Sequence, residues 1–221
     1  MFKAENVTVK ISAYTILRGL TIEVPSGSIV ALVGRNGAGK TTTLRAIMGL
    51  ISTAQGTMRL DDHDFCSLPA HERAKLGIGY LPEDRRLISG LTVEENLMIP
   101  FQALGFASRE PRLGTIYRLI PEVKAVANRR AVELSGGQQK MVALGRSFVN
   151  ARRLLLLDEP FEGLSVALSR KLAEVIHRFQ EAEEGLSVLV AESDSKRAAM
   201  LTERTYVIER GEVVERNSVG G

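Results

Sequence analysis

Alternating apolar and polar positions open the chain. The alternation runs through residues 2–11 and again through residues 20–24, and a Pro-Ser-Gly turn follows at 25–27. Strict alternation is typical of strands that bury one face and leave the other in water. The pattern therefore predicts an antiparallel layer of strands at the start of the chain.

Other stretches are apolar without alternation, as expected for strands of a parallel sheet that is buried on both faces. These stretches are residues 28–33, 77–81, 154–157 and 187–191. Apolar residues at helical spacing predict helices over residues 41–50, 69–76 and 168–179, and residues 205–215 resemble a closing hairpin. Strands that alternate with helices indicate an α/β fold.

A long helical segment interrupts this alternation. Thr92 and Glu95 form a capping box, which predicts that a helix starts there. From that point to about residue 150 the pattern is mainly helical. We therefore expect a single domain, with residues 1–83 and 151–221 forming an α/β core and residues from about 84 to 150 forming a helical subdomain.

A glycine-rich loop follows the apolar run at 28–33. Its residues are Gly34, Arg35, Asn36, Gly37, Ala38, Gly39, Lys40, Thr41 and Thr42. They match the G-x-x-x-x-G-K-[ST] pattern, in which backbone amides and a helix N-terminus cradle the phosphates of a nucleotide. Lys40 would neutralise the β- and γ-phosphates, and the Thr41 hydroxyl would complete a Mg²⁺ shell. An ordinary glycine turn requires neither residue.

Two acids end the apolar run at 154–157. Asp158 and Glu159 stand at the carboxyl end of a predicted central strand, where open α/β sheets bind ligands. Asp158 would hold Mg²⁺ through its water shell, and Glu159 would orient and polarise an attacking water. The alternative is that these acids cap the next helix. Pro160 and the long gap to Leu168 make capping less attractive.

A second unusual helix start lies at Ser135, Gly136, Gly137 and Gln138. Ser135 and Gln138 form a capping box, and the two glycines leave the backbone amides of the first turn uncovered. A plain N-cap does not explain two glycines there, since each costs about 1 kcal/mol relative to alanine. Such a helix start is a ready anion site, so we expect a ligand to approach this backbone closely.

Composition limits the partners and the cellular compartment that we expect for this protein. Lys plus Arg number 29 against 26 Asp plus Glu, a balance that does not by itself suggest nucleic acid, although the basic residues are concentrated between 108 and 153. Cys66 is the only cysteine, so no disulfide can form within the chain and a reducing cytoplasm fits best. The acidic cluster at 61–64 is more typical of a hairpin turn than of a metal site. No apolar run approaches the roughly 20 residues that span a bilayer.

Three motifs in this order and spacing resemble the ATPase subunit of an ATP-binding cassette (ABC) transporter over nearly the entire chain. They are the phosphate loop, Leu-Ser-Gly-Gly-Gln at 134–138, which is diagnostic for the family, and Leu-Asp-Glu-Pro at 157–160. Residues 80–86 and 91–97 are similar to the ATPase subunits of branched-chain amino acid importers. The resemblance implies a P-loop NTPase core with an antiparallel β subdomain and a helical subdomain.

The resemblance also implies ligands and partners. ATP and Mg²⁺ would be sandwiched in a head-to-tail homodimer, or in a heterodimer with another ABC ATPase, with Ser135 to Gln138 of one copy facing the γ-phosphate bound by the other. Tyr14 would lie against adenine, and Glu83 would join Thr41 and Asp158 near the metal. Integral membrane permease subunits would dock beside the hinge at 82–86. The protein would then be cytoplasmic, on the inner face of the membrane, without a direct nucleic-acid partner.

Three positions depart from the usual family pattern. Glu83 stands where Gln is common, Ser165 where Asp is common, and Ser193 where His is common. Ser193 belongs with Lys40 and Glu159 among the catalytic positions, yet serine is shorter than histidine and carries no positive charge.

The residues and the family resemblance together leave three functions open. The favoured one is a working ATPase that powers import of branched-chain amino acids or a related small polar solute. The second is a regulatory ATP-binding subunit of an asymmetric pair. The third, a soluble ATPase in cofactor assembly or a nucleic-acid process, is weakened by the absence of a coiled-coil insertion, cysteine pairs or a second cassette.

Overall fold

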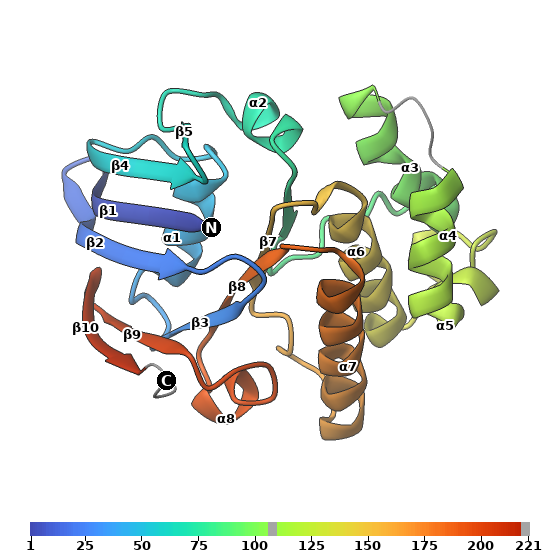
Figure 1. Cartoon of the computed structure of the whole chain (residues 1–221). Coiled ribbons are helices and arrows are strands. Elements are labelled where there is room, and N and C mark those ends of the chain that lie inside the picture. The colour runs from blue at the N-terminus through green and yellow to red at the C-terminus, as the bar shows by residue number, and fades with distance from the viewer. Residues whose placement is uncertain (106–109, 218–221) are drawn as a thin grey trace.

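Two β-sheets form the framework of the protein (Figure 1). The computed structural model describes residues 1–105 and 110–217, so Arg109 of the basic stretch lies outside the described residues. The smaller sheet is antiparallel, with strand order β2-β1-β4-β5. Its strands are β1 (Phe2–Ile11), β2 (Tyr14–Val24), β4 (Gln55–Leu60) and β5 (His63–Asp64).

The larger sheet has the strand order β10-β9-β3-β8-β7-β6 and is parallel from β9 to β6, with β10 antiparallel at one edge. Its strands are β3 (Ile29–Val33), β6 (Ile78–Leu81), β7 (Leu154–Asp158), β8 (Ser187–Glu192), β9 (Thr205–Glu209) and β10 (Glu212–Asn217). The central strands β3, β8 and β7 are almost completely buried, as their continuous apolar sequences predict.

Helices cover both faces of the larger sheet, and a group of them lies on the side remote from the antiparallel sheet (Figure 1). The helices are α1 (Lys40–Ile47), α2 (Ala70–Lys75), α3 (Val93–Leu104), α4 (Glu110–Leu119), α5 (Pro121–Ala125), a 3₁₀ turn (Ala131–Glu133), α6 (Gly136–Asn150), α7 (Val166–Ala182) and α8 (Ser195–Ala198). Helices α3, α4 and α5 all pack against α6.

The larger sheet has one hydrophobic core on each of its two faces. In β7, Leu154 and Leu156 point toward α1 and the antiparallel sheet, while Leu155 and Leu157 point toward α6 and α7. The alternation follows from the two-residue repeat of a strand, which sends successive side chains to opposite faces. The carboxyl end of β7 is thereby held between two packed layers.

Most predicted elements are present. Residues 61–62 form the turn between β4 and β5, and the predicted capping boxes at Thr92 and Ser135 start α3 and α6. The first helix ends at Ile47 rather than at residue 50, because Gly49 adopts a left-handed φ of 75° directly after the Met48 C-cap. The proposed limits of the helical subdomain, about 84 and 150, stay a prediction.

Candidate functional site

The glycine-rich loop joins β3 to α1 in a tight turn. Gly37 and Gly39 adopt φ values of 81° and 114°, which side chains disfavour. A Cβ on Gly34 would lie 2.4 Å from the carbonyl oxygen of Ile208, so no side chain fits there. The Lys40 ammonium folds back and donates a 2.7 Å hydrogen bond to the Gly34 carbonyl. The loop backbone therefore wraps closely around the Lys40 ammonium, which also lies 3.3 Å from the Arg35 carbonyl oxygen.

A cavity of about 470 Å³ opens above this loop. It brings predicted phosphate-loop residues together with Glu83 and Glu159, which come from distant parts of the sequence. Its lining consists of Ile16, Asn36, Gly37, Gly39, Lys40, Thr41, Thr42, Glu83, Glu159 and Glu162. Gly34, Arg35 and Ala38 belong to the same loop without lining the cavity.

Asp158 ends the buried strand β7 and meets α1. Its Oδ1 accepts a 3.0 Å hydrogen bond from the Thr41 hydroxyl, and the Tyr80 hydroxyl donates to Oδ2 at 3.4 Å. Burial raises the pKa of the Asp158 carboxyl to about 6, the hydrogen bond from Thr41 opposes this rise, and the Glu83 and Glu159 carboxylates add to it. A nearby cation would stabilise the charged form, which is the form a metal site needs.

Glu159 follows directly and has a strained backbone, with a left-handed φ of 45°. Its Oε1 lies 3.1 Å from the Lys40 ammonium, and this pair is almost fully buried. Its Oε2 accepts hydrogen bonds from the backbone amide and the hydroxyl of Ser193, both at 3.2 Å. Glu159 thus contacts both of the other predicted catalytic residues, Lys40 and Ser193.

Glu192 is a member of this cluster that sequence reasoning missed. It ends β8, is completely buried, and its Oε1 accepts a 3.1 Å hydrogen bond from the Phe161 amide. Among the described residues, Oε2 of Glu192 has no hydrogen-bond partner. Burial raises the pKa of this carboxyl to about 8, the Phe161 amide opposes the shift, and the nearby Glu159 carboxylate adds to it. An acid at the end of a predicted buried strand was the available signal.

Two other predicted groups lie apart from the loop cavity in this single chain. Ser135, Gly137 and Gln138 line a smaller hollow of about 180 Å³ at the start of α6. Tyr14 is the first residue of β2, is 73% exposed, and does not line the cavity, whereas Ile16 does. Alternation extended back from Leu20 would place Ile16 on the core face, but a register shift in the pairing with β1 buries Leu17 there instead, so the sequence pattern did not indicate Ile16.

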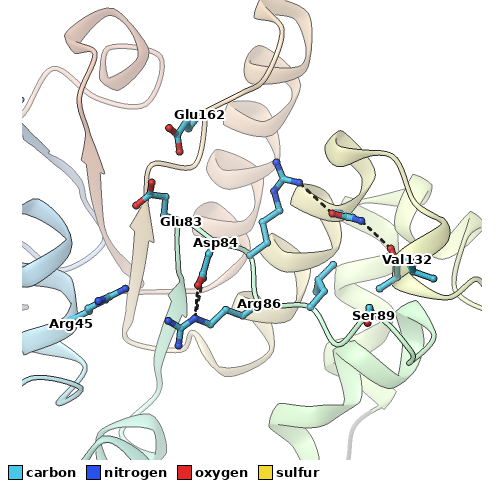
Figure 2. Close-up of a pocket in the computed structure, with 11 residues that line it drawn as sticks. Arg45, Glu83, Asp84, Arg86, Ser89, Val132 and Glu162 are labelled. Atoms are coloured by element: carbon cyan, nitrogen blue, oxygen red, sulfur yellow. Dashed lines mark hydrogen bonds and ion pairs between the residues drawn. The ribbon is translucent and has the colours of Figure 1, made fainter. Parts of the chain in front are cut away.

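A second cavity, of about 620 Å³, adjoins the first and shares Glu83 and Glu162 with it (Figure 2). Arg45 reaches it from α1, and the Arg86 guanidinium donates to the Asp84 carboxylate at 2.8 Å. The Arg146 guanidinium on α6 donates to the carbonyls of Arg85 and Arg86. We call the segment 82–86 the hinge. It connects the loop cavity to α6.

The hinge backbone is unusual. Arg85 and Arg86 have left-handed φ values of 60° and 48°, which non-glycine residues rarely adopt. Arg146 fixes both carbonyls from the side of α6, and the Arg85 guanidinium donates to the Gln139 side chain at 3.3 Å. Strain of this kind persists only where surrounding contacts determine the conformation.

Comparison with known proteins decides the family. The profile of the family described as ABC transporter matches residues 17–162. The chain belongs to the ABC transporter family. The predicted resemblance is therefore confirmed, and this ABC cassette is an ATPase with an α/β P-loop fold.

The cassette is similar to characterised relatives over most of its length. It is 35% identical to the high-affinity branched-chain amino acid transport ATP-binding protein BraG of Pseudomonas aeruginosa, covering 93% of this chain and 89% of that one. It is 31% identical to the lipopolysaccharide export system ATP-binding protein LptB of Escherichia coli K12, covering 96% and 88%.

A solved structure shows the same architecture. The dimeric, post-hydrolysis ATP-binding cassette MJ0796, bound to ADP and Pi, superposes with a TM-score of 0.87 at 26% identity, covering 100% of both chains. ATPases of this family work as dimers together with membrane permease subunits. Within residues 1–105 and 110–217 of the cassette, no helix is both long enough and apolar enough to cross a membrane.

Proposed function

We propose that the cassette binds ATP in the cavity above the glycine-rich loop and hydrolyses it with Glu159 as the group that orients and polarises the attacking water. The observation that carries this proposal is that Lys40, Thr41 and Glu159 line one cavity, and that the Thr41 hydroxyl is hydrogen-bonded to the buried Asp158 carboxylate. Exposed loop amides and Lys40 would take the phosphates, and stabilisation of the charge that develops on them lowers the barrier.

The same residues fit a magnesium ion. Thr41 and Asp158 offer a hydroxyl and a carboxylate that already touch, and Glu83 lines the same cavity. Oxygen ligands of this kind are the ones Mg²⁺ prefers. Burial is the main cause of the raised pKa of the Asp158 carboxyl, and the Glu83 and Glu159 carboxylates add to it, so a bound cation would lower this pKa. Bound Mg²⁺ would neutralise charge on the phosphate oxygens.

The Lys40 ammonium lies 3.1 Å from the Glu159 carboxylate beside the glycine-rich loop. Phosphate oxygens of arriving ATP would compete for the Lys40 ammonium and release the Glu159 carboxylate from it. Ser193 would keep hold of that carboxylate through two hydrogen bonds. Nucleotide binding would thereby free the Glu159 carboxylate to orient and polarise the attacking water.

We propose that a second cassette, identical or different, completes the nucleotide-binding site. Ser135, Gly136, Gly137 and Gln138 at the start of α6 do not line the loop cavity of their own chain. The amides of a helix N-terminus favour an anion, here the γ-phosphate held by the partner copy. Tyr14, which is 73% exposed, is available to stack on adenine.

We propose that the subunit powers import of branched-chain amino acids or a related small polar solute. Support comes from BraG, at 35% identity. Similarity to LptB supports export of lipopolysaccharide as the competing function. The permease would dock at the hinge cavity, between the α/β core and the helical subdomain, on the cytoplasmic face of the membrane. Isolation of the native complex from membranes, followed by identification of the co-purifying chains and bound solute, distinguishes the two functions.

The hydrolytic role has a direct test. ATP turnover of the purified cassette, alone and with its membrane partner, should exceed that of Glu159→Gln by roughly 100-fold or more, because the amide cannot polarise water. Equal rates for the two proteins would refute the proposal.

A regulatory function is the alternative, and Ser193 favours it. The Ser193 hydroxyl contacts Glu159 but supplies no positive charge for a γ-phosphate. If this cassette hydrolyses weakly beside a more active partner, Ser193→His should raise its turnover about tenfold or more. An unchanged rate would favour the working ATPase.

A further inference from the structure

A buried lysine on α6 contacts the backbone of Glu159, the proposed catalytic residue. Lys140 lies on α6 and is 1% exposed. Its ammonium donates a 2.8 Å hydrogen bond to the backbone carbonyl of Glu159. This group is separate from Lys40, which contacts the Glu159 side chain.

Keeping a charge at this position is costly. Removing an ammonium from water costs several kcal/mol, and an apolar side chain of similar length would fill the same space without that penalty. Burial lowers the pKa of Lys140, the Arg85 guanidinium lowers it further, and the Glu192 and Glu162 carboxylates oppose both effects. A packing role alone therefore does not account for the lysine.

The carbonyl that Lys140 holds belongs to a strained residue. Glu159 has a φ of 45°, which for a side chain larger than glycine costs of order 1–3 kcal/mol. Its amide donates to Ala191 at 3.0 Å, and its carbonyl also accepts from the Glu162 amide at 3.2 Å. Removing Lys140 would leave one fewer contact to fix this peptide.

Glu192 holds the next part of the segment from the other side, through the Phe161 amide. Residues 159–161 are therefore fixed between α6 and the end of β8. The direction of the Glu159 carboxylate depends on this backbone. An error of about 1 Å in the position of a catalytic group can reduce a rate by about 100-fold.

We propose that Lys140 is a positioning residue, which fixes the backbone of Glu159 from the same helix that begins with Ser135 to Gln138. The proposal rests on the proposed catalytic role of Glu159. Helix α6 would then do two things. Its N-terminus would face the nucleotide bound by the partner cassette, and its Lys140 would fix Glu159 of its own chain.

The first test separates kcat from KM. Lys140→Met should lower kcat for ATP about 100-fold while KM changes less than about threefold, since the phosphate loop is untouched. Lys140→Arg retains the charge and donors and should restore kcat to within about threefold of wild type. The matched control is Lys75→Met, an exposed lysine on α2 paired with Glu72, which should behave as wild type.

The second test does not require hydrolysis. Hydrogen–deuterium exchange of the nucleotide-free chain should be at least about threefold faster at the Phe161 and Glu162 amides in Lys140→Met. If that variant does not fold, Lys140→Gln, one bond shorter, is used for both measurements. Wild-type exchange at these amides, or a wild-type kcat in a folded variant, overturns the inference. If the turnover of wild type is no higher than that of Glu159→Gln, the proposed function is wrong instead. The exchange rates at the Phe161 and Glu162 amides then still test whether Lys140 fixes this backbone.

Discussion

At the scale of single residues, burial raises the pKa of two carboxyls at the site, those of Asp158 and Glu192. Glu192 illustrates this, because its carboxyl is completely buried and its pKa is raised from 4.5 to about 8. The native protein then holds a proton that the unfolded chain releases above pH 4.5. The free energy of unfolding should therefore fall as pH rises between about 5 and 8.

Glu192→Gln should remove this dependence, because a glutamine cannot ionise and can still accept from the Phe161 amide. Urea unfolding at several pH values should show wild type losing at least about 1 kcal/mol relative to the variant across that range, since one pKa unit corresponds to about 1.4 kcal/mol. Glu174→Gln, on the exposed face of α7, serves as the control. Parallel profiles for wild type and Glu192→Gln would contradict the prediction.

At the scale of elements, a close contact between β6 and α6 positions α6 on the larger sheet. A Cβ on Gly79 would lie 2.4 Å from the Ser147 carbonyl oxygen and 2.7 Å from the Ala151 Cβ. Gly79→Ala should therefore push α6 from the sheet and destabilise the protein by about 1–3 kcal/mol, lowering the melting temperature by roughly 2–10 °C. Gly114→Ala, in α4 with nothing within 4 Å, should be neutral or stabilising. Equal melting temperatures for wild type and Gly79→Ala would contradict this account.

Elements were also what the sequence predicted best. Periodicity located the strands of the larger sheet together with β1 and the end of β2, and the capping boxes at Thr92 and Ser135 marked two helix starts, because these signals depend only on near neighbours. Contacts between distant segments were less accessible. The Lys140 bond to Glu159 and the Glu192 bond to Phe161 join parts of the chain that only the completed sheet brings together. Spacing alone indicated Asp158 and Glu159 at the end of β7, but it did not show that Glu192, at the end of β8, would lie beside them.

At the scale of the whole molecule, the question is whether two copies of this chain complete each other's nucleotide sites. In the single chain, Ser135 lines a hollow separate from the loop cavity, so its proposed ligand must come from a second cassette. Glu159→Gln, which would bind ATP without consuming it, should form a dimer with Mg²⁺ and ATP and remain monomeric without them. Light scattering after size-exclusion chromatography measures both states.

Adding Ser135→Glu to that variant should prevent dimerisation, because a carboxylate facing a γ-phosphate adds a like-charge contact that costs several kcal/mol at an interface. Ser52→Glu, an exposed change in the loop after α1, introduces the same charge and should leave the dimer intact. If Glu159→Gln alone stays monomeric with ATP, two copies of this chain do not pair, and the heterodimer becomes the working arrangement. If it dimerises and Ser135→Glu has no effect, the start of α6 does not face the nucleotide. The two failures are distinct, so the experiment separates the choice of partner from the geometry of the interface.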